Sequence, residues 1–145
     1  APLDLVILAL GTNDTFAEPS RKPQDTVNAM RSLITTARDL PTAPGSSVPN
    51  TNPPKVMIVS PPNCLSQPLV TGAGFPELDE LTRWLPELAK LYGELAIEQD
   101  IYFADAAQFC EPDPVDGLHL DVENTRKLGI GIAETIALEG FADFC

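Results

Sequence analysis

The feature that most constrains the fold is an apolar run close to the start of the chain. Leu3–Leu10 is apolar at every position except Asp4, and Gly11 ends the run. A strand with one face in solvent alternates apolar and polar residues, whereas a strand covered on both faces of a parallel sheet reads as a continuous apolar run. The run therefore predicts a buried strand in a parallel sheet whose two faces are covered by helices.

Two more strands and two exposed loops are predicted from the local composition of the chain. Lys55–Ser60 and Ile101–Ala104 are short runs rich in apolar residues, which predict the second and third strands. Thr42–Pro54 and Asn63–Pro76 are rich in proline and small residues and predict exposed loops. Because helical patterns separate the strands, the order predicts a layered α/β sheet with right-handed crossovers, in one domain over residues 1–145.

The helical patterns carry start signals and one interruption. Pro23 stands where the first turn of a helix tolerates proline, and Asp121 is placed to cap the last helix. The apolar face of that last helix is formed by Leu128, Ile132 and Ile136. In the long middle pattern Leu78–Leu95, Pro86 removes a helix hydrogen bond and predicts a kink or a junction of two helices.

Charge and composition exclude several classes of function. The formal net charge of −12 argues against nucleic acid and anionic membranes as partners, because both require a basic surface. No apolar stretch approaches the roughly 20 residues that a membrane span requires. Cys64, Cys110 and Cys145 are too few for a disulfide framework. They leave a Cys110–Cys145 bridge open, and they leave the compartment undetermined.

Two short polar motifs follow predicted strands. Gly11–Asp14 (Gly-Thr-Asn-Asp) follows the first strand, and Asp116–His119 (Asp-Gly-Leu-His) follows the third and contains the only histidine. The carboxyl ends of parallel strands meet at one rim of the sheet, so both motifs are expected there. An Asp-x-x-His pair supplies a general base with the carboxylate that orients it, and the amide of Asn13 could stabilise an oxyanion.

These motifs resemble two sequence blocks of a known family of serine hydrolases. Asp4–Asp14 resembles the third block of the SGNH (GDSL-type) hydrolases, and Asp116–His119 resembles the fifth. Val59–Pro62 and the closing helix around residues 128–129 are similar to the arylesterase and acyltransferase branch. The resemblance implies the three-layer, flavodoxin-like SGNH-hydrolase fold with a parallel sheet, here lacking its N-terminal strands.

The resemblance also implies roles for individual residues. His119 would act as general base toward a serine hydroxyl and then as acid toward the leaving group, and Asp116 would hold its tautomer. Asn13 would donate its side-chain amide to the oxyanion. The chemistry requires no cofactor and no metal, and one imidazole does not supply the usual ligand set of a metal site.

The residues around Asn13 are expected to support the turn. Gly11, Thr12 and Asp14 are the supporting residues, and Asp14 is expected to brace the turn by accepting backbone N–H groups. Thr12 and Phe16 either line the edge of a pocket or serve only as turn and packing residues.

The nucleophile of the family is not found. The family carries its serine in a Gly-Asp-Ser block and an oxyanion glycine in a second block, and neither block is in this sequence. Ser60 follows a strand, but Pro61 and Pro62 behind it prevent the helix that a nucleophile elbow requires. Cys64 has no neighbour that would lower its pKa. The remaining serines lack a supporting turn: Ser20, Ser32, Ser46, Ser47 and Ser66.

The missing blocks have a structural consequence. Without the first strand of the family, Leu3–Leu10 would expose a sheet edge, and the sequence between Asp4 and Leu10 offers no charge or proline to protect it. We therefore expect an N-terminal fragment of the same hydrolase, or a second copy of the chain, to cover this edge. The small and apolar residues of the predicted loops favour a small uncharged acyl ester as substrate.

Two functions follow from this sequence. The first is an ester hydrolase that uses an acyl-serine mechanism, with acyl transfer as its variant, once the missing N-terminal segment supplies the nucleophile; the chain alone would be inactive. The second is a catalytically silent, truncated homologue that acts as a binding or assembly module. A nucleotide-binding α/β domain is set aside, because the turn after Leu10 lacks the glycine-rich phosphate-binding patterns.

Overall fold

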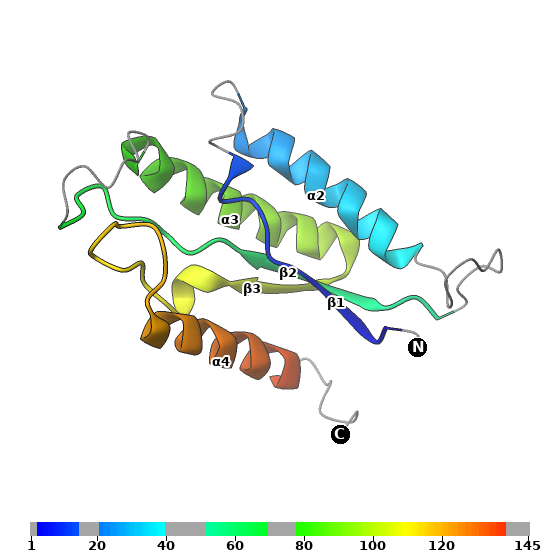
Figure 1. Ribbon diagram of the computed structural model, residues 1–145. Coiled ribbons are helices and arrows are strands. Elements are labelled where there is room, and N and C mark those ends of the chain that lie inside the picture. The colour runs from blue at the N-terminus through cyan, green and yellow to red at the C-terminus, as the bar shows by residue number, and fades with distance from the viewer. Residues whose placement is uncertain (1–2, 15–20, 40–51, 70–77, 139–145) are drawn as a thin grey trace.

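The chain forms a three-stranded parallel sheet between two layers of helices (Figure 1). The structure is a computed structural model that describes residues 3–14, 21–39, 52–69 and 78–138. The strands are β1 (Leu5–Leu8), β2 (Lys55–Ser60) and β3 (Tyr102–Asp105), in the order β1-β2-β3. All three predicted strands are confirmed, with ends that shift by one or two residues.

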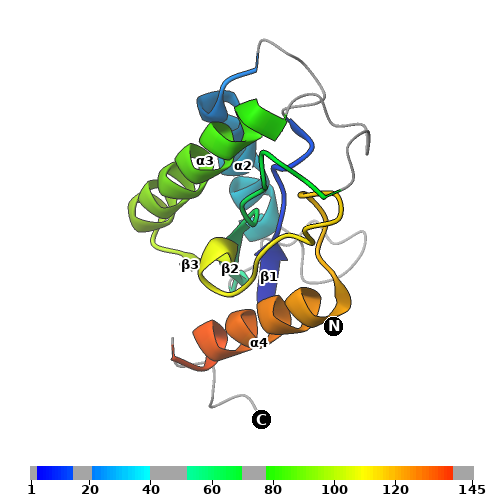
Figure 2. The same ribbon diagram turned by 90° about the vertical axis from the view of Figure 1, so that its left-hand side faces the viewer.

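The helices divide between the two faces of the sheet (Figures 1 and 2). Helices α2 (Pro23–Arg38) and α3 (Leu78–Gln99) lie side by side on one face, and α4 (Val122–Leu138) lies on the other. A short 3-10 helix, η1 (Ala106–Gln108), follows β3. The predicted layered α/β architecture is therefore confirmed.

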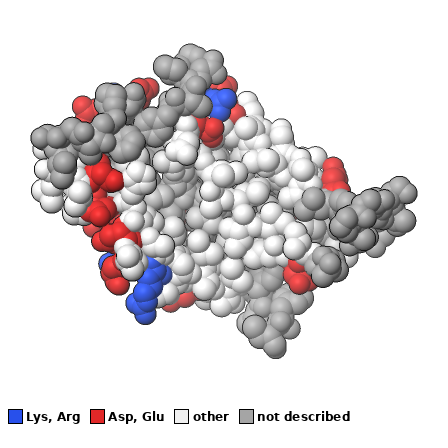
Figure 3. Space-filling view, in the orientation of Figure 1, with Lys and Arg blue, Asp and Glu red and all other residues white. Residues whose placement is uncertain are grey.

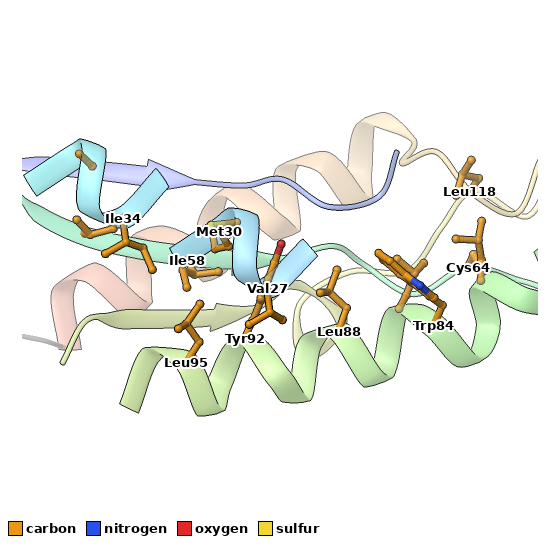
Figure 4. Close-up of a cluster of buried hydrophobic side chains, with 14 of the residues drawn as sticks. Val27, Met30, Ile34, Ile58, Cys64, Trp84, Leu88, Tyr92, Leu95 and Leu118 are labelled. Carbon is orange, nitrogen blue, oxygen red and sulfur yellow. The ribbon is translucent and has the colours of Figure 1, made fainter. Parts of the chain in front are cut away.

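The larger core fills the space between the sheet and helices α2 and α3 (Figure 4). Val56 and Ile58 of β2 contribute to this core, whereas the alternate residues Met57 and Val59 face α4. Strand β2 is buried at every position except Lys55, as expected for a central strand of a parallel sheet. The helix side chains shown in Figure 4 that meet β2 include Met30, Ile34, Leu88, Tyr92 and Leu95.

Strand β1 departs from the sequence prediction, because no residue of Leu3–Leu10 is buried. Within the described residues, β1 pairs with β2 and has no strand on its other side. Val6 and Leu8 pack against the larger core, but Ile7 on the opposite face is 41% exposed. The prediction of a buried strand was wrong for this chain, since burial of an apolar run also requires a neighbour on each side.

Helix α3 runs without a break through Pro86. The sequence predicted either a kink or a junction of two helices at Pro86. The junction of two helices is wrong, because α3 is a single helix. Pro86 lies on the exposed side of α3, between the buried residues Leu85 and Leu88. Solvent can therefore bond the carbonyl that loses its partner, while the apolar face stays continuous along the core.

Helix α4 packs through the face that its sequence predicts. Its apolar residues Leu128, Ile132 and Ile136 lie against a second core cluster that contains Met57 and Ala104. The cap at Asp121 is also confirmed, because its carboxylate accepts from the backbone N–H of Asn124 at 2.7 Å.

Two further sequence expectations concern the cysteines and the membrane. Cys64 and Cys110 are buried free thiols, and Cys145, the other half of the bridge left open above, lies outside the described residues. The Cys110 thiol donates to the carbonyl oxygen of Ala106, at the start of η1, at 3.3 Å. In the described part of the chain, no helix has the length and apolarity needed to cross a membrane.

Candidate active site

Both polar motifs lie on the side of the sheet where the strands end. The view in Figure 2 faces this side, with the segment after β1 and the loop after β3 both toward the viewer. The structure thus places Gly11–Asp14 and Asp116–His119 on one rim, as the strand order predicts.

The motif after β1 is a tight turn that presses against helix α3. The backbone N–H of Asp14 donates to the carbonyl oxygen of Gly11 at 3.2 Å. Gly11 has φ +129°, and a Cβ built there would lie 2.8 Å from Cδ2 of Leu88 and 3.0 Å from the hydroxyl of Tyr92. Glycine is therefore required at this position both for its backbone conformation and for the close approach to α3.

The carboxylate of Asp14 binds a side chain from outside the turn. Its Oδ1 accepts from Nη1 of Arg21 at 2.8 Å, and both side chains are about one-third exposed. Among the described residues, the partner of this carboxylate is therefore a side chain, rather than the backbone N–H groups that the sequence led us to expect. Arg21 lies two residues before the start of α2, so this ion pair links the turn to that helix.

The side chain of Asn13 is presented to solvent. Asn13 is exposed, and within the described residues its amide has no hydrogen-bond partner. A hollow of about 310 Å³ lies beside it and is lined by residues of the turn, including Thr12, and by Leu33 and Tyr92. Thr12 therefore lies at the edge of a cavity, whereas Phe16 is outside the described residues.

The motif after β3 brings a carboxylate and an imidazole into direct contact. Nδ1 of His119 lies 2.7 Å from Oδ2 of Asp116, so the contact expected from the Asp-x-x-His spacing is present. The other oxygen, Oδ1, accepts from the backbone N–H groups of Leu118 at 2.9 Å and of His119 at 3.0 Å. With Nδ1 as the donor to Asp116, the basic lone pair of the imidazole lies on Nε2.

The same contacts fix the charge of Asp116. Bonds from the backbone N–H of Leu118 and from the His119 side chain hold the pKa of this carboxyl below its usual value. Asp116 is therefore ionised at neutral pH. The imidazole itself is 67% exposed, so it is accessible to a group that approaches the rim.

Backbone bonds attach this loop to the segment after β2. The N–H of Leu65 donates to the carbonyl of Gly117 at 2.8 Å, and that of Leu69 donates to the carbonyl of Pro114 at 2.8 Å. Gly117 has φ +74°, and a Cβ there would lie 2.9 Å from the carbonyl oxygen of Leu65. The glycine of the Asp-Gly-Leu-His motif thus allows the loop to approach this segment.

The hydroxyls of Ser60 and Ser32 are held in structural hydrogen bonds, the Cys64 thiol is buried, and Ser66 is exposed. Ser60 is 1% exposed; its hydroxyl donates to Asp105 at 2.9 Å and accepts from the N–H of Ala106 at 3.1 Å. Ser32 donates to the carbonyl of Asn28 on α2. Burial raises the pKa of the Cys64 thiol, which disfavours the nucleophilic thiolate. Ser20, Ser46 and Ser47 lie outside the described residues.

Two residues of the site were missed by sequence reasoning. Tyr92 of α3 donates its hydroxyl to the carbonyl of Leu10 at 3.2 Å, and Arg21 binds Asp14. Tyr92 was read as part of an apolar helical stripe, and no local signal connects it to a turn 82 residues away. Arg21 stands close to Asp14 in sequence, and its position just before Pro23 was an available signal.

No cluster suited to a metal ion is found among the residues that the structure describes; this covers groups of three or more His, Cys, Asp and Glu. The fold and the site define an α/β protein of the class that sets an Asp–His pair and an Asn-containing turn at the ends of parallel strands. The chain belongs to the GDSL-like Lipase/Acylhydrolase family, the SGNH hydrolases, whose sequence model matches residues 1–124. No curated protein matches the chain.

Solved structures agree with the family. An aryl esterase of M. smegmatis is 35% identical with a TM-score of 0.77, and the match covers 94% of this chain and 61% of that one. A carbohydrate acetylesterase family member from Sinorhizobium meliloti is 29% identical with a TM-score of 0.79, covering 95% and 62%. The chain therefore spans about three-fifths of the length of the structures that it matches.

Proposed function

We propose that this chain forms the general-base and oxyanion part of an ester hydrolase that works through an acyl-serine intermediate. The observation that carries the proposal is the 2.7 Å contact between Nδ1 of His119 and Asp116 on an exposed rim. It is supported by membership of a lipase and acylhydrolase family and by similarity to an aryl esterase and a carbohydrate acetylesterase.

His119 performs the proton transfers of this mechanism. Its Nε2 takes the proton of a serine hydroxyl as the oxygen attacks the ester carbonyl, and returns it to the departing alcohol. The ionised carboxylate of Asp116 holds the ring in the tautomer that this step requires, and it stabilises the imidazolium that forms. Water then attacks the acyl-serine by the same route, and a second alcohol in place of water would give acyl transfer.

Asn13 stabilises the charge that develops on the carbonyl oxygen. Its exposed amide lacks a partner within the described residues and stands on the same rim as His119. A side-chain amide placed before the reaction is an efficient oxyanion donor, because it does not need to reorganise when the charge appears.

The nucleophile comes, in this proposal, from a segment that adds to the free edge of β1. The described hydroxyls of Ser60 and Ser32 are engaged in structural bonds. The face over β1, between α2 and α4, has an uncharged centre in the view of Figure 3. Ile7 of β1, Leu10 after it and Leu33 of α2 are exposed apolar side chains. A strand and helix preceding this chain would bury this surface and bring a serine to the same rim.

The substrate class is a small uncharged acyl ester. The hollow beside Asn13 is lined largely by small and apolar residues, among them Ala9, Ala29 and Leu33. The lining also contains Asp14, whose charge is paired with Arg21, and among the described residues no cationic side chain lines the hollow to attract an anionic substrate. An aryl or acetyl ester fits this composition.

A covalent serine-directed probe tests the proposal. The gene product is treated, as expressed, with a fluorophosphonate, and the labelled peptide is mapped. We expect one labelled serine upstream of Ala1, with labelling abolished in His119→Ala and unchanged in Glu134→Ala, which removes an exposed carboxylate on α4. Equal labelling of His119→Ala would overturn the assignment of the base.

Intact mass and oligomeric state decide the alternative. If the expressed protein contains only the 145 residues of this chain and no serine is labelled, the chain is a silent binding or assembly module. If that protein is a dimer, a second copy covers β1. Rapid labelling of a serine within residues 1–145 would show that the nucleophile does not come from another segment.

A further inference from the structure

The turn that carries Asn13 is fixed at its start by a buried hydroxyl. Tyr92 is 0% exposed, and its hydroxyl donates to the carbonyl of Leu10 at 3.2 Å. This bond sets the plane of the peptide between Leu10 and Gly11, the residue at which the backbone takes a positive φ and reverses direction. Because the buried ring cannot move without disturbing the core, the start of the turn is tied to α3.

The end of the turn is fixed by a charged group from another segment. Asp14 closes the turn by donating its backbone N–H to Gly11, and its carboxylate accepts from Arg21. Arg21 lies two residues before Pro23, the first residue of α2. The end of the turn is therefore connected to α2, as its start is connected to α3.

Asn13 lies between these two attachments. Its side chain is exposed and has no partner within the described residues, so its direction depends on the backbone of the turn. The burial of Tyr92 and, after it, the negative charge of Asp14 raise the pKa of the phenol, which keeps the hydroxyl protonated and able to donate. Leu88 fills the remaining space beneath Gly11.

We propose that Tyr92 and Arg21 are positioning residues that together fix the direction in which Asn13 presents its amide to the oxyanion. This inference rests on the proposed function, because it assigns residues that act through the oxyanion donor. Neither residue needs to touch the substrate. An error of about 1 Å in the position of a catalytic group can cost on the order of 10²-fold in rate, so loss of either attachment should reduce kcat.

Steady-state hydrolysis of p-nitrophenyl acetate by the complete hydrolase tests the proposal. We expect Tyr92→Phe to lower kcat about tenfold with KM changed less than about twofold, since the lost interaction matters in the transition state. Arg21→Met should lower kcat by a smaller factor, and Arg21→Lys should restore most of it. The matched controls are Tyr102→Phe at the start of β3 and Arg31→Met, which breaks the exposed Arg31–Glu98 pair; both should leave kcat unchanged.

A double-variant cycle separates positioning from simple stabilisation. In an Asn13→Ala background the amide is absent, so Tyr92→Phe should cause little further loss of kcat. An equal tenfold loss in that background, or an unchanged kcat in Tyr92→Phe alone, would overturn the proposal. If Asn13→Ala itself has no effect, the oxyanion assignment of the proposed function fails as well. If Asn13→Ala is strongly impaired and Tyr92→Phe is not, only the positioning role fails.

Discussion

The two halves of the candidate site lie on one rim but are built in different ways. Asp116 contacts His119 three residues later, and its carboxylate binds groups within the same four-residue motif. The turn that carries Asn13 depends instead on Arg21 and on Tyr92, which lies far along the chain in α3. The comparison teaches that a motif's spacing predicts its geometry only where the contacts that shape it are local.

Replacing the carboxylate of Asp116 should show that it orients the imidazole of His119 and adds little to the stability of the fold. Asp116→Asn keeps an oxygen that can accept from the backbone N–H groups, but it no longer fixes the imidazole tautomer. We expect kcat for ester hydrolysis to fall on the order of 10⁴-fold. The free energy of unfolding at neutral pH should change by less than about 1 kcal/mol, because the pair is largely solvated.

The matched control is Asp113→Asn in the same loop, where, within the described part of the chain, the side chain accepts from the N–H of Val115. This variant should retain its activity. A loss of kcat equal to that of Asp116→Asn would mean that loop conformation, rather than the Asp116–His119 contact, is what matters.

Removing the side-chain amide of Asn13 should lower kcat less than the Asp116→Asn substitution does. Asn13→Ala should lower kcat by roughly 10²–10³-fold with little change in KM, since the oxyanion exists only in the transition state. Asn28→Ala, on the exposed side of α2, is the control and should be neutral. An increase in KM without a loss of kcat would indicate that Asn13 binds the ground state instead.

A methyl group at Gly11 should show that this turn depends on tertiary packing. The backbone conformation and the contact with Leu88 make Gly11→Ala costly, by about 1–3 kcal/mol of unfolding free energy in urea. Gly129→Ala is the matched control, because its added Cβ meets nothing within 4 Å on α4. That variant should be stabilised by up to about 1 kcal/mol. Equal stability of the two variants would contradict the close approach of the turn to α3.

The smallest expected effect concerns the pH dependence of stability. The pKa of Asp116 is lower in the folded chain than in the unfolded chain, so the ionised group stabilises the fold above its unfolded pKa. This contribution should be lost as pH falls below about 4 and through the folded pKa. Urea midpoints measured from pH 6 to pH 2.5 should therefore show the unmodified chain losing its advantage over Asp116→Asn. A difference that stays constant across this range would mean that Asp116 is not perturbed by folding.

Much of the fold could be predicted from the sequence because its signals are local. The apolar runs located three strands, Pro23 and Asp121 marked helix starts, and the stripe of α4 identified its buried face. The burial of the first strand was predicted wrongly, because an apolar run does not show whether a neighbouring strand is present. Continuity of α3 through Pro86 was also undecided, since it depends on which side of the helix faces solvent.

The sequence by itself determined the parallel α/β order, the rim that carries both motifs, and the Asp116–His119 contact. Each of these depends on spacing over a few residues or on the order of strands along the chain. Only the tertiary structure showed that Arg21 and Tyr92 hold the turn of Asn13. These are contacts between distant segments, and packing in three dimensions selects them from many partners that the sequence alone leaves equivalent.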